Sequence, residues 1–218
     1  MRGDKLKVNI LGARMIPQVS DDLRERLSLL PEEQSIGILT TDCDDASYAA
    51  LDAATKMTPV RVVYARSMYA GSSNASTKLA GEFIGIIAAK TPADCRSGME
   101  AATGYIGDDC CFESANDDDS IPFFAHTISR SGTYLPSTCG QEPGIPLAYV
   151  IAPPMEAILG LDAALKAADV KLIQFYGPPS ETNFAGGLLT GDQAACKAAC
   201  DAFRTAVIDA AEDPDSMR

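Results

Sequence analysis

The chain has 218 residues and a formal net charge of −12, and 46% of its residues are hydrophobic. This composition is typical of a globular protein, and the length allows one large domain or two of about 100 residues each. The acidic balance, without a basic stripe, argues against nucleic acid as a partner, and no apolar run reaches the roughly 18 residues of a membrane span.

The first segment, MRGDKLKVNILGA, has a basic flank but only a short apolar stretch, which does not match a secretory signal. We therefore expect the seven cysteines to be reduced thiols in a cytosol. In the first half, periodicity predicts a helix after the Asp-rich residues 41–45, with the stripe Tyr48, Leu51, Thr55 and Thr58. The other expected elements are strands within residues 6–19 and at 35–39, 60–65 and 82–88, a short helix from residue 21, a long loop at 66–81, and a helix capped by Thr91.

In the second half, Pro122–Ile128 is expected to form a strand, and Leu147–Tyr176 is expected to form a strand, a helix and a strand. A shorter loop at Gly177–Gly186, a strand at Gly187–Thr190 and a helix opened by a capping box at Thr190–Gln193 follow. The apolar stripe predicted to face the core on the central helix is Met155, Ile158, Leu161, Leu165 and Ala168, and Pro153 and Pro154 begin that helix.

An internal repeat relates the two halves. LDAATK at Leu51–Lys56 recurs as LDAALK at Leu161–Lys166, 110 residues later, and a strand-like run follows each copy. AGEFIG and AGGLLT repeat further along. We therefore predict a tandem duplication with domains at residues 1–108 and 109–218. Each would place two helices on one face of a mainly antiparallel sheet, an α+β arrangement of ferredoxin-like type.

Enzymatic constellations are not found in the sequence. The single histidine, His126, lies in a strand-like run, where a lone histidine is most often structural. No nucleophile elbow, phosphate loop or dinucleotide fingerprint occurs, and a site with several histidine ligands for zinc is excluded. The sequence therefore favours a protein that is not an enzyme and has no catalytic residues, resident metal or required cofactor.

An acidic cluster, Asp42, Asp44 and Asp45, is the sharpest polar feature. Carboxylates at this place could cap the helix and favour its dipole, or could in addition form a site for a small cation or an amine. The two loops, with Tyr69 on one and Phe184 on the other, could be ordinary surface loops or could meet around a shared axis.

Several long segments resemble a known family. LAYVIAPP, LDAALKAADVKLIQFY and AGGLLTGDQAACKAACDAF are similar to the bacterial microcompartment (BMC) shell domain. Together with TTDCDDASY, YARSMYAG, FFAHTISRSGTYL and PPSETNFAG in this order, they resemble the EutL-type tandem-domain shell proteins of ethanolamine-utilisation microcompartments. The resemblance implies two circularly permuted BMC domains per chain and a homotrimer that imitates a hexamer. It also implies a cytoplasmic shell in which other shell proteins adjoin edge to edge.

The resemblance also implies two kinds of pore for small metabolites. A small acidic pore that binds ethanolamine would use Asp44, Asp45, Glu82 and Phe112. Cobalamin binding is implied too, without residues. The loops that would surround a gated central pore contain Arg66, Ser67, Met68, Tyr69, Ala70, Gly71, Pro178, Pro179, Ser180, Glu181, Thr182, Asn183 and Phe184. The alternative hypothesis is a ferredoxin-like sensor or regulatory subunit in which Asp44 and Asp45 bind an amine effector.

Overall fold

The computed structural model describes residues 1–68, 81–107 and 110–216. The chain forms two compact units. The N-terminal unit consists of Val8–Cys110 and Gly132–Pro143, and the C-terminal unit consists of Met1–Lys7, Cys111–Ser131 and Gly144–Arg218. Within the described residues, no helix is both long enough and apolar enough to cross a membrane.

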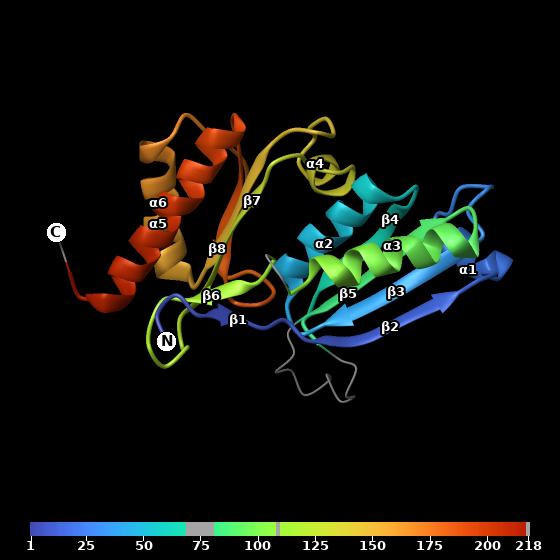
Figure 1. The fold of residues 1–218 in the computed structure, drawn as a ribbon, viewed down its shortest axis with the longest axis horizontal. Coiled ribbons are helices and arrows are strands. Elements are labelled where there is room, and N and C mark those ends of the chain that lie inside the picture. Colours follow the sequence, from blue (N-terminus) through green and yellow to red (C-terminus); the bar gives the residue numbers. More distant parts are fainter. Residues whose placement is uncertain (69–80, 108–109, 217–218) are drawn as a thin grey trace. The chain divides into compact units, whose positions relative to one another are not determined.

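The N-terminal unit is a four-stranded antiparallel sheet with strand order β2-β3-β5-β4, and α2 and α3 pack against it (Figure 1). Its elements are β2 (Ile10–Ile16), α1 (Asp21–Arg26), β3 (Ser35–Thr41), α2 (Asp44–Met57), β4 (Arg61–Ser67), β5 (Phe83–Ala89), α3 (Pro92–Tyr105) and α4 (Tyr134–Thr138). The helix α3 begins where predicted, because the Thr91 hydroxyl accepts a hydrogen bond from the Asp94 amide at 3.1 Å.

The C-terminal unit repeats this arrangement. Its sheet has strand order β1-β6-β7-β8-β10-β9, and the last four strands correspond one by one to β2-β3-β5-β4. The elements are β1 (Lys5–Leu6), β6 (Phe112–Ser114), β7 (Pro122–Ile128), β8 (Leu147–Ala152), α5 (Pro154–Ala167), β9 (Lys171–Tyr176), β10 (Ala185–Thr190) and α6 (Gln193–Glu212). The helices α5 and α6 pack on β8, and α6 also packs on β7. The predicted duplication and α+β fold are confirmed.

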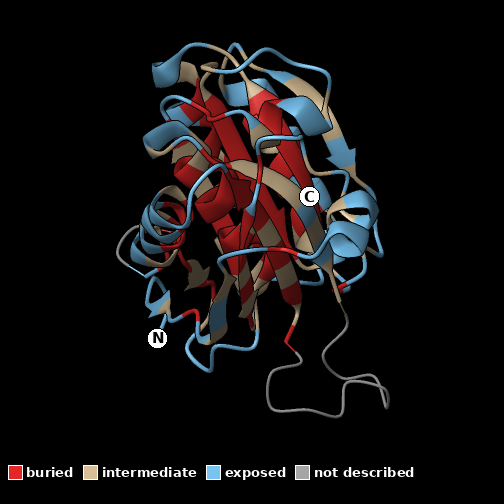
Figure 2. Ribbon diagram, turned by 90° about the vertical axis from the view of Figure 1, so that its right-hand side faces the viewer, coloured by how far each residue is buried: buried red, intermediate tan, exposed pale blue. Residues whose placement is uncertain are grey.

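The core of each unit lies between its sheet and its helix pair, and Figure 2 shows buried residues on strands as well as on helices. In the C-terminal unit, Phe203 of α6 is fully buried among Phe123, Val150 and Leu161. The last helix of each half buries corresponding residues, because Cys95 and Ala102 of α3 and Cys196 and Phe203 of α6 are all fully buried.

Three details differ from the sequence prediction. The strand expected to end at Ala65 continues to Ser67, because residues up to Ser67 pair with β5. The capping box at Thr190 is wrong: the helix α6 begins two residues later, and the Asp192 carboxylate accepts from the Ala195 amide at 2.7 Å. An aspartate is as good a cap as a threonine, so the pattern alone selected the wrong residue.

The third correction concerns α5. Met155, Ile158 and Leu165, which were predicted to face the core, are 47%, 45% and 40% exposed. Leu161 of the same predicted stripe is buried as expected, and the rest of the buried face consists of Ala157, Gly160 and Ala164. These small residues follow the same 3,4 spacing, and at Gly160 an added Cβ would lie 2.6 Å from the ring of Phe203. Close approach of α6 therefore selects the small face and leaves the large apolar residues outside.

Two segments are exchanged between the halves of the sequence: residues 1–7 belong to the C-terminal unit, and residues 132–143 belong to the N-terminal unit. Residues 1–7 contribute β1, which pairs with β6. Residues 132–143, which include α4, pack against α2. The buried Asp52 of α2 holds the second segment, because its carboxylate accepts hydrogen bonds from the amides of Gly132 at 2.6 Å, Tyr134 at 3.0 Å and Leu135 at 2.9 Å. The predicted domain boundaries, 1–108 and 109–218, follow the sequence repeat, whereas the two compact units are defined by packing. The predicted domain boundaries therefore stay a prediction.

Candidate functional site

The predicted acidic residues lie at the start of α2. Asp44 and Asp45 form its first turn and are only 7% and 6% exposed. The N-cap residue is Cys43, whose side chain makes no capping bond, and the Asp44 carboxylate accepts a hydrogen bond from the Asp45 amide of the first turn at 2.9 Å. Their place in the first turn still favours the helix dipole. A favourable interaction with the helix dipole does not require that two adjacent carboxylates be buried.

Glu82 lies next to this turn because of backbone hydrogen bonds. Its amide donates to the Thr41 carbonyl at 2.9 Å, and its carbonyl accepts from the Met68 amide at 2.8 Å. At the preceding residue, Gly81, an added Cβ would lie 2.0 Å from the Thr41 carbonyl oxygen, so only glycine allows this close approach. Glu82 is thus fixed between the end of β3 and the end of β4.

The electrostatics show that these carboxylates interact. Burial, and after it the negative charges of Asp44 and Asp42, raise the pKa of Glu82 to about 7. Burial also raises the pKa of Asp44, although a hydrogen bond with the Ser67 side chain opposes it. The carboxylate of Asp42 is held by the Asn9 amide at 2.7 Å and the Asn9 side chain at 2.6 Å. A bound cation would relieve this accumulation of negative charge.

The ligand that fits such a cluster is a cation with several N–H donors. In the part of the chain that the structure describes, no three His, Cys, Asp or Glu side chains are arranged to hold a metal ion. A primary ammonium needs no fixed coordination geometry and can donate to two or three carboxylate oxygens at once. The carboxylates of Asp44 and Glu82 could accept such hydrogen bonds.

Phe112, the fourth predicted residue of this site, belongs to the C-terminal unit, whereas the three acidic residues belong to the N-terminal unit. Its ring stacks on Phe124 with centroids 5.3 Å apart and meets the edge of Phe184 at 5.9 Å. The ring of His126 also stacks on Phe124, with ring centroids 5.4 Å apart. His126 thus packs in an aromatic cluster on β7.

The residues predicted to surround a central pore fall into two groups. Arg66 and Ser67 are strand residues at the end of β4, and Met68 follows them. The other three predicted residues of this loop, Tyr69, Ala70 and Gly71, lie outside the described residues. Sequence reasoning placed Ser67 only in the loop, yet its hydroxyl also bonds to the acidic cluster and lies 3.0 Å from the Tyr48 hydroxyl. No pattern in the sequence indicated this contact, because the strand was expected to end at Ala65, before Ser67.

The second predicted loop, Pro178–Phe184, is a compact turn. The amides of Ser180 and Asn183 donate to the carbonyls of Phe184 and Ser180 at 3.0 and 3.1 Å, and Asn183 has a φ of 66°. Thr182 is buried, at 7% exposure, and Phe184 contacts Phe112. These contacts fix the shape of the loop within its own unit.

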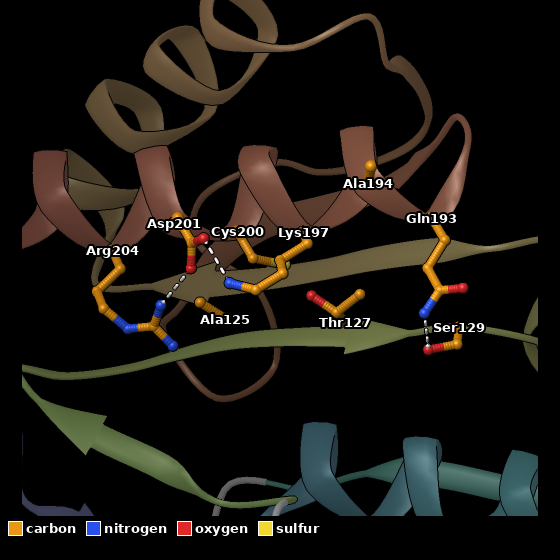
Figure 3. A pocket seen from close by; sticks show the side chains of 9 residues that line it. All are labelled: Ala125, Thr127, Ser129, Gln193, Ala194, Lys197, Cys200, Asp201 and Arg204. Atoms are coloured by element: carbon orange, nitrogen blue, oxygen red, sulfur yellow. Dashed lines mark hydrogen bonds and ion pairs between the residues drawn. The ribbon is translucent and has the colours of Figure 1, made fainter.

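A separate surface pocket of about 560 Å³ lies between β7 and α6 of the C-terminal unit (Figure 3). Its charged side chains compensate each other, because Asp201 pairs with Lys197 at 2.7 Å and with Arg204 at 3.0 Å. Arg204 also pairs with Glu113 at 2.7 Å. Each charged residue that lines the pocket is thus engaged in an ion pair, and Glu113, which pairs with Arg204, is not itself part of the lining.

The comparisons with known proteins agree with this architecture. The family model described as the BMC domain matches residues 35–114 and 151–213. The bacterial microcompartment shell protein EutL of Clostridium perfringens is 55% identical over 214 residues, which cover 98% of this chain and 99% of that protein. The chain belongs to the EutL family of bacterial microcompartment shell proteins. The EutL shell protein of Escherichia coli is 44% identical over 211 residues, covering 97% of this chain and 96% of its own.

Solved structures of the EutL family have the same fold. The crystal structure of the ethanolamine utilization protein EutL from Leptotrichia buccalis matches with a TM-score of 0.96 and 59% identity, covering 99% of this chain and all of that one. The shell protein PduB matches with a TM-score of 0.75 and 19% identity over 94% of this chain, which shows a shared fold alone. The predicted BMC fold and EutL-type family are confirmed.

Proposed function

We propose that this EutL-family chain is a non-enzymatic tile of a cytoplasmic microcompartment shell, and that its acidic cluster forms a small pore or binding site for an organic ammonium such as ethanolamine. The observation that supports the ligand class is the elevated pKa of Glu82, about 7, next to the buried Asp44. These carboxylates repel each other in a partly desolvated place, and an ammonium ion would remove that repulsion.

The proposed assembly is a homotrimer with the outline of a hexamer. Each chain supplies two units that share the order of four corresponding strands, so three chains would supply six similar units around one axis. Such trimers would adjoin other shell proteins edge to edge, and the loops that include Arg66–Met68 and Pro178–Phe184 would surround a central pore that opens and closes for metabolites. Cobalamin binding, which the family resemblance suggested, belongs to the same proposal and has no assigned residues.

Calorimetry with ethanolamine tests the proposed site. We expect saturable binding to the purified protein, weakened at least about tenfold by Asp44→Asn and by Glu82→Gln, because each removes one charged acceptor of the ammonium. Asp169→Asn is the matched control, since Asp169 is an exposed carboxylate of the other unit. Equal affinity in all four proteins would remove the acidic cluster from the site.

The sensor hypothesis shares the amine site but not the assembly. A sensor would remain as dispersed dimers or tetramers at high concentration, whereas a shell tile forms extended layers. Electron microscopy of concentrated protein therefore separates the two functions even when both bind an amine.

A further inference from the structure

The pocket between β7 and α6 is an elongated groove. It follows α6 from Gln193 to Arg204, which is a rise of about 16 Å along the helix. The opposite wall is formed by Ala125, Thr127 and Ser129, which alternate along the chain and therefore lie on one face of the sheet. We call this groove, with the lining residues labelled in Figure 3, the α6 groove. Its volume of about 560 Å³ lies in the range of small-molecule sites.

The internal repeat shows which side chains open the α6 groove. β7 corresponds to β2, and the sheet registers make Met15 the counterpart of Thr127. Aligning ADC of α3 with the first AAC of α6 makes Met99 the counterpart of Cys200. Met99 is buried, and an added Cβ at Gly37 of the neighbouring strand would lie 2.4 Å from its Sδ atom. The shared fold therefore accepts two methionines at these places, and the smaller pair opens the groove of the second half.

Cations outnumber anions among the lining side chains, which include Lys197, Arg204 and one carboxylate, Asp201. Both cations point at this carboxylate: Lys197 Nζ lies 2.7 Å from Oδ2, and Arg204 Nη1 lies 3.0 Å from Oδ1 (Figure 3). Glu113, outside the lining, accepts from Arg204 Nε at 3.0 Å and from Nη2 at 2.7 Å. Glu113 thus fixes the guanidinium with Nη1 toward the groove, and Asp201 occupies the place of a bound anion.

A ligand with more charge than a carboxylate can replace Asp201. The side chains of Lys197 and Asp201 are 69% and 50% exposed, and ion pairs this exposed contribute little to stability. A phosphate monoester carries about two negative charges at pH 7 and has three acceptor oxygens, so it forms stronger hydrogen bonds with an ammonium and a guanidinium. The displaced Asp201 side chain can turn into solvent.

We propose that the α6 groove binds a small organic phosphate, with the phosphate between Lys197 and Arg204 in the place of the Asp201 carboxylate. The rest of the ligand lies along the groove toward Ser129 and Gln193, whose hydroxyl and amide are 3.0 Å apart and can donate to or accept from a hydroxyl group. This site lies within the C-terminal unit and takes a ligand of opposite charge to that of the acidic cluster. It depends neither on the amine site nor on assembly.

Calorimetry with glycerol 3-phosphate at low ionic strength tests the charges of the site. We expect saturable binding that Lys197→Gln weakens at least about tenfold, and no binding of glycerol. Asp201→Asn should strengthen binding about threefold or more, because it removes the competing carboxylate. Asp162→Asn is the matched control: it makes the same charge change in an i,i+4 pair with Lys166, away from the groove, and should leave the affinity within about twofold.

A pair of methionines tests the shape of the groove without changing any charge. Thr127→Met with Cys200→Met installs the residues of the first half and should weaken binding at least about tenfold. The charge variants carry the test by themselves if circular dichroism shows that this double variant is not folded. Inorganic phosphate that binds as tightly as glycerol 3-phosphate would overturn the organic ligand. The absence of saturable binding up to about 10 mM, or equal strengthening by Asp201→Asn and Asp162→Asn, would overturn the site.

Discussion

Replacing Asp52 by alanine should destabilise the N-terminal unit strongly. The carboxylate is 1% exposed and accepts three backbone amides of residues 132–135. Each such bond to a charged acceptor contributes about 1.5 kcal/mol, and the buried amides find no new acceptor in the variant. Burial raises the pKa of Asp52, which means that its charged form carries a desolvation cost, and the variant no longer has that cost. We therefore expect a net loss of about 3 kcal/mol of unfolding free energy.

The internal repeat supplies the matched control. Asp162→Ala removes only an exposed pair with Lys166, which should cost about 0.5 kcal/mol or less. Urea unfolding of both variants, followed by circular dichroism at one protein concentration, gives the two free energies. Hydrogen exchange adds a local measurement, because the amides of Gly132, Tyr134 and Leu135 should lose protection in Asp52→Ala. Equal losses in the two variants, with these amides still protected, would refute the role of Asp52.

Three further predictions follow from single sites. Glu82→Gln should remove a pH dependence of stability: with its folded pKa raised from 4.5 to about 7, Glu82 makes the wild type lose stability as pH rises from about 4.5 to 7. The full shift is equivalent to about 3 kcal/mol, which solvent screening of this half-buried group reduces to about 1–2 kcal/mol in urea titrations. Gly132→Ala should lower the thermal midpoint, because its Cβ would lie 2.2 Å from a backbone oxygen of α2, whereas Gly104→Ala, with nothing within 4 Å, should stabilise α3 by about 0.5–1 kcal/mol. Phe203→Ala should cost about 3–5 kcal/mol of unfolding free energy, because the ring is fully buried in the core of the C-terminal unit.

The acidic cluster also predicts how binding depends on pH. An ammonium prefers the ionised form of Glu82, so binding releases the proton that this group holds below pH 7. The affinity for ethanolamine should therefore increase between about pH 5 and 7 and level off above about pH 8. Calorimetry in buffers of different ionisation enthalpy measures the released proton. An affinity that is constant over this range would contradict the assignment of Glu82.

The sequence was sufficient for the repeat and for most elements. LDAATK and LDAALK identified two copies of one fold, and the strand order β2-β3-β5-β4 and its counterpart confirm it. Local patterns failed where a distant residue decides the outcome. Met155, Ile158 and Leu165 were assigned to the core because periodicity gives the spacing of a face but not its direction. The ring of Phe203 lies so close to Gly160 that an added Cβ would be 2.6 Å away, so this contact requires the face of small residues to be the buried one.

The candidate site was predictable in part for the same reason. Asp44 and Asp45 follow a strand directly, so their place at a helix start is a local property. Glu82 reaches them through backbone bonds to Thr41 and Met68, and no sequence pattern indicates that contact. Asp52 was not recognised at all, because its partners begin at Gly132, far along the sequence, and its neighbours in LDAATK resemble those of the exposed Asp162.

Electron microscopy of the purified chain tests the central claim, that the chain is a tile of a shell, most directly. Concentrated protein should form flat layers or discs built from trimers with a hexagonal outline, and two units of each chain should be visible around the axis. Dispersed particles of two or four chains in the wild type, at every concentration, would contradict the account.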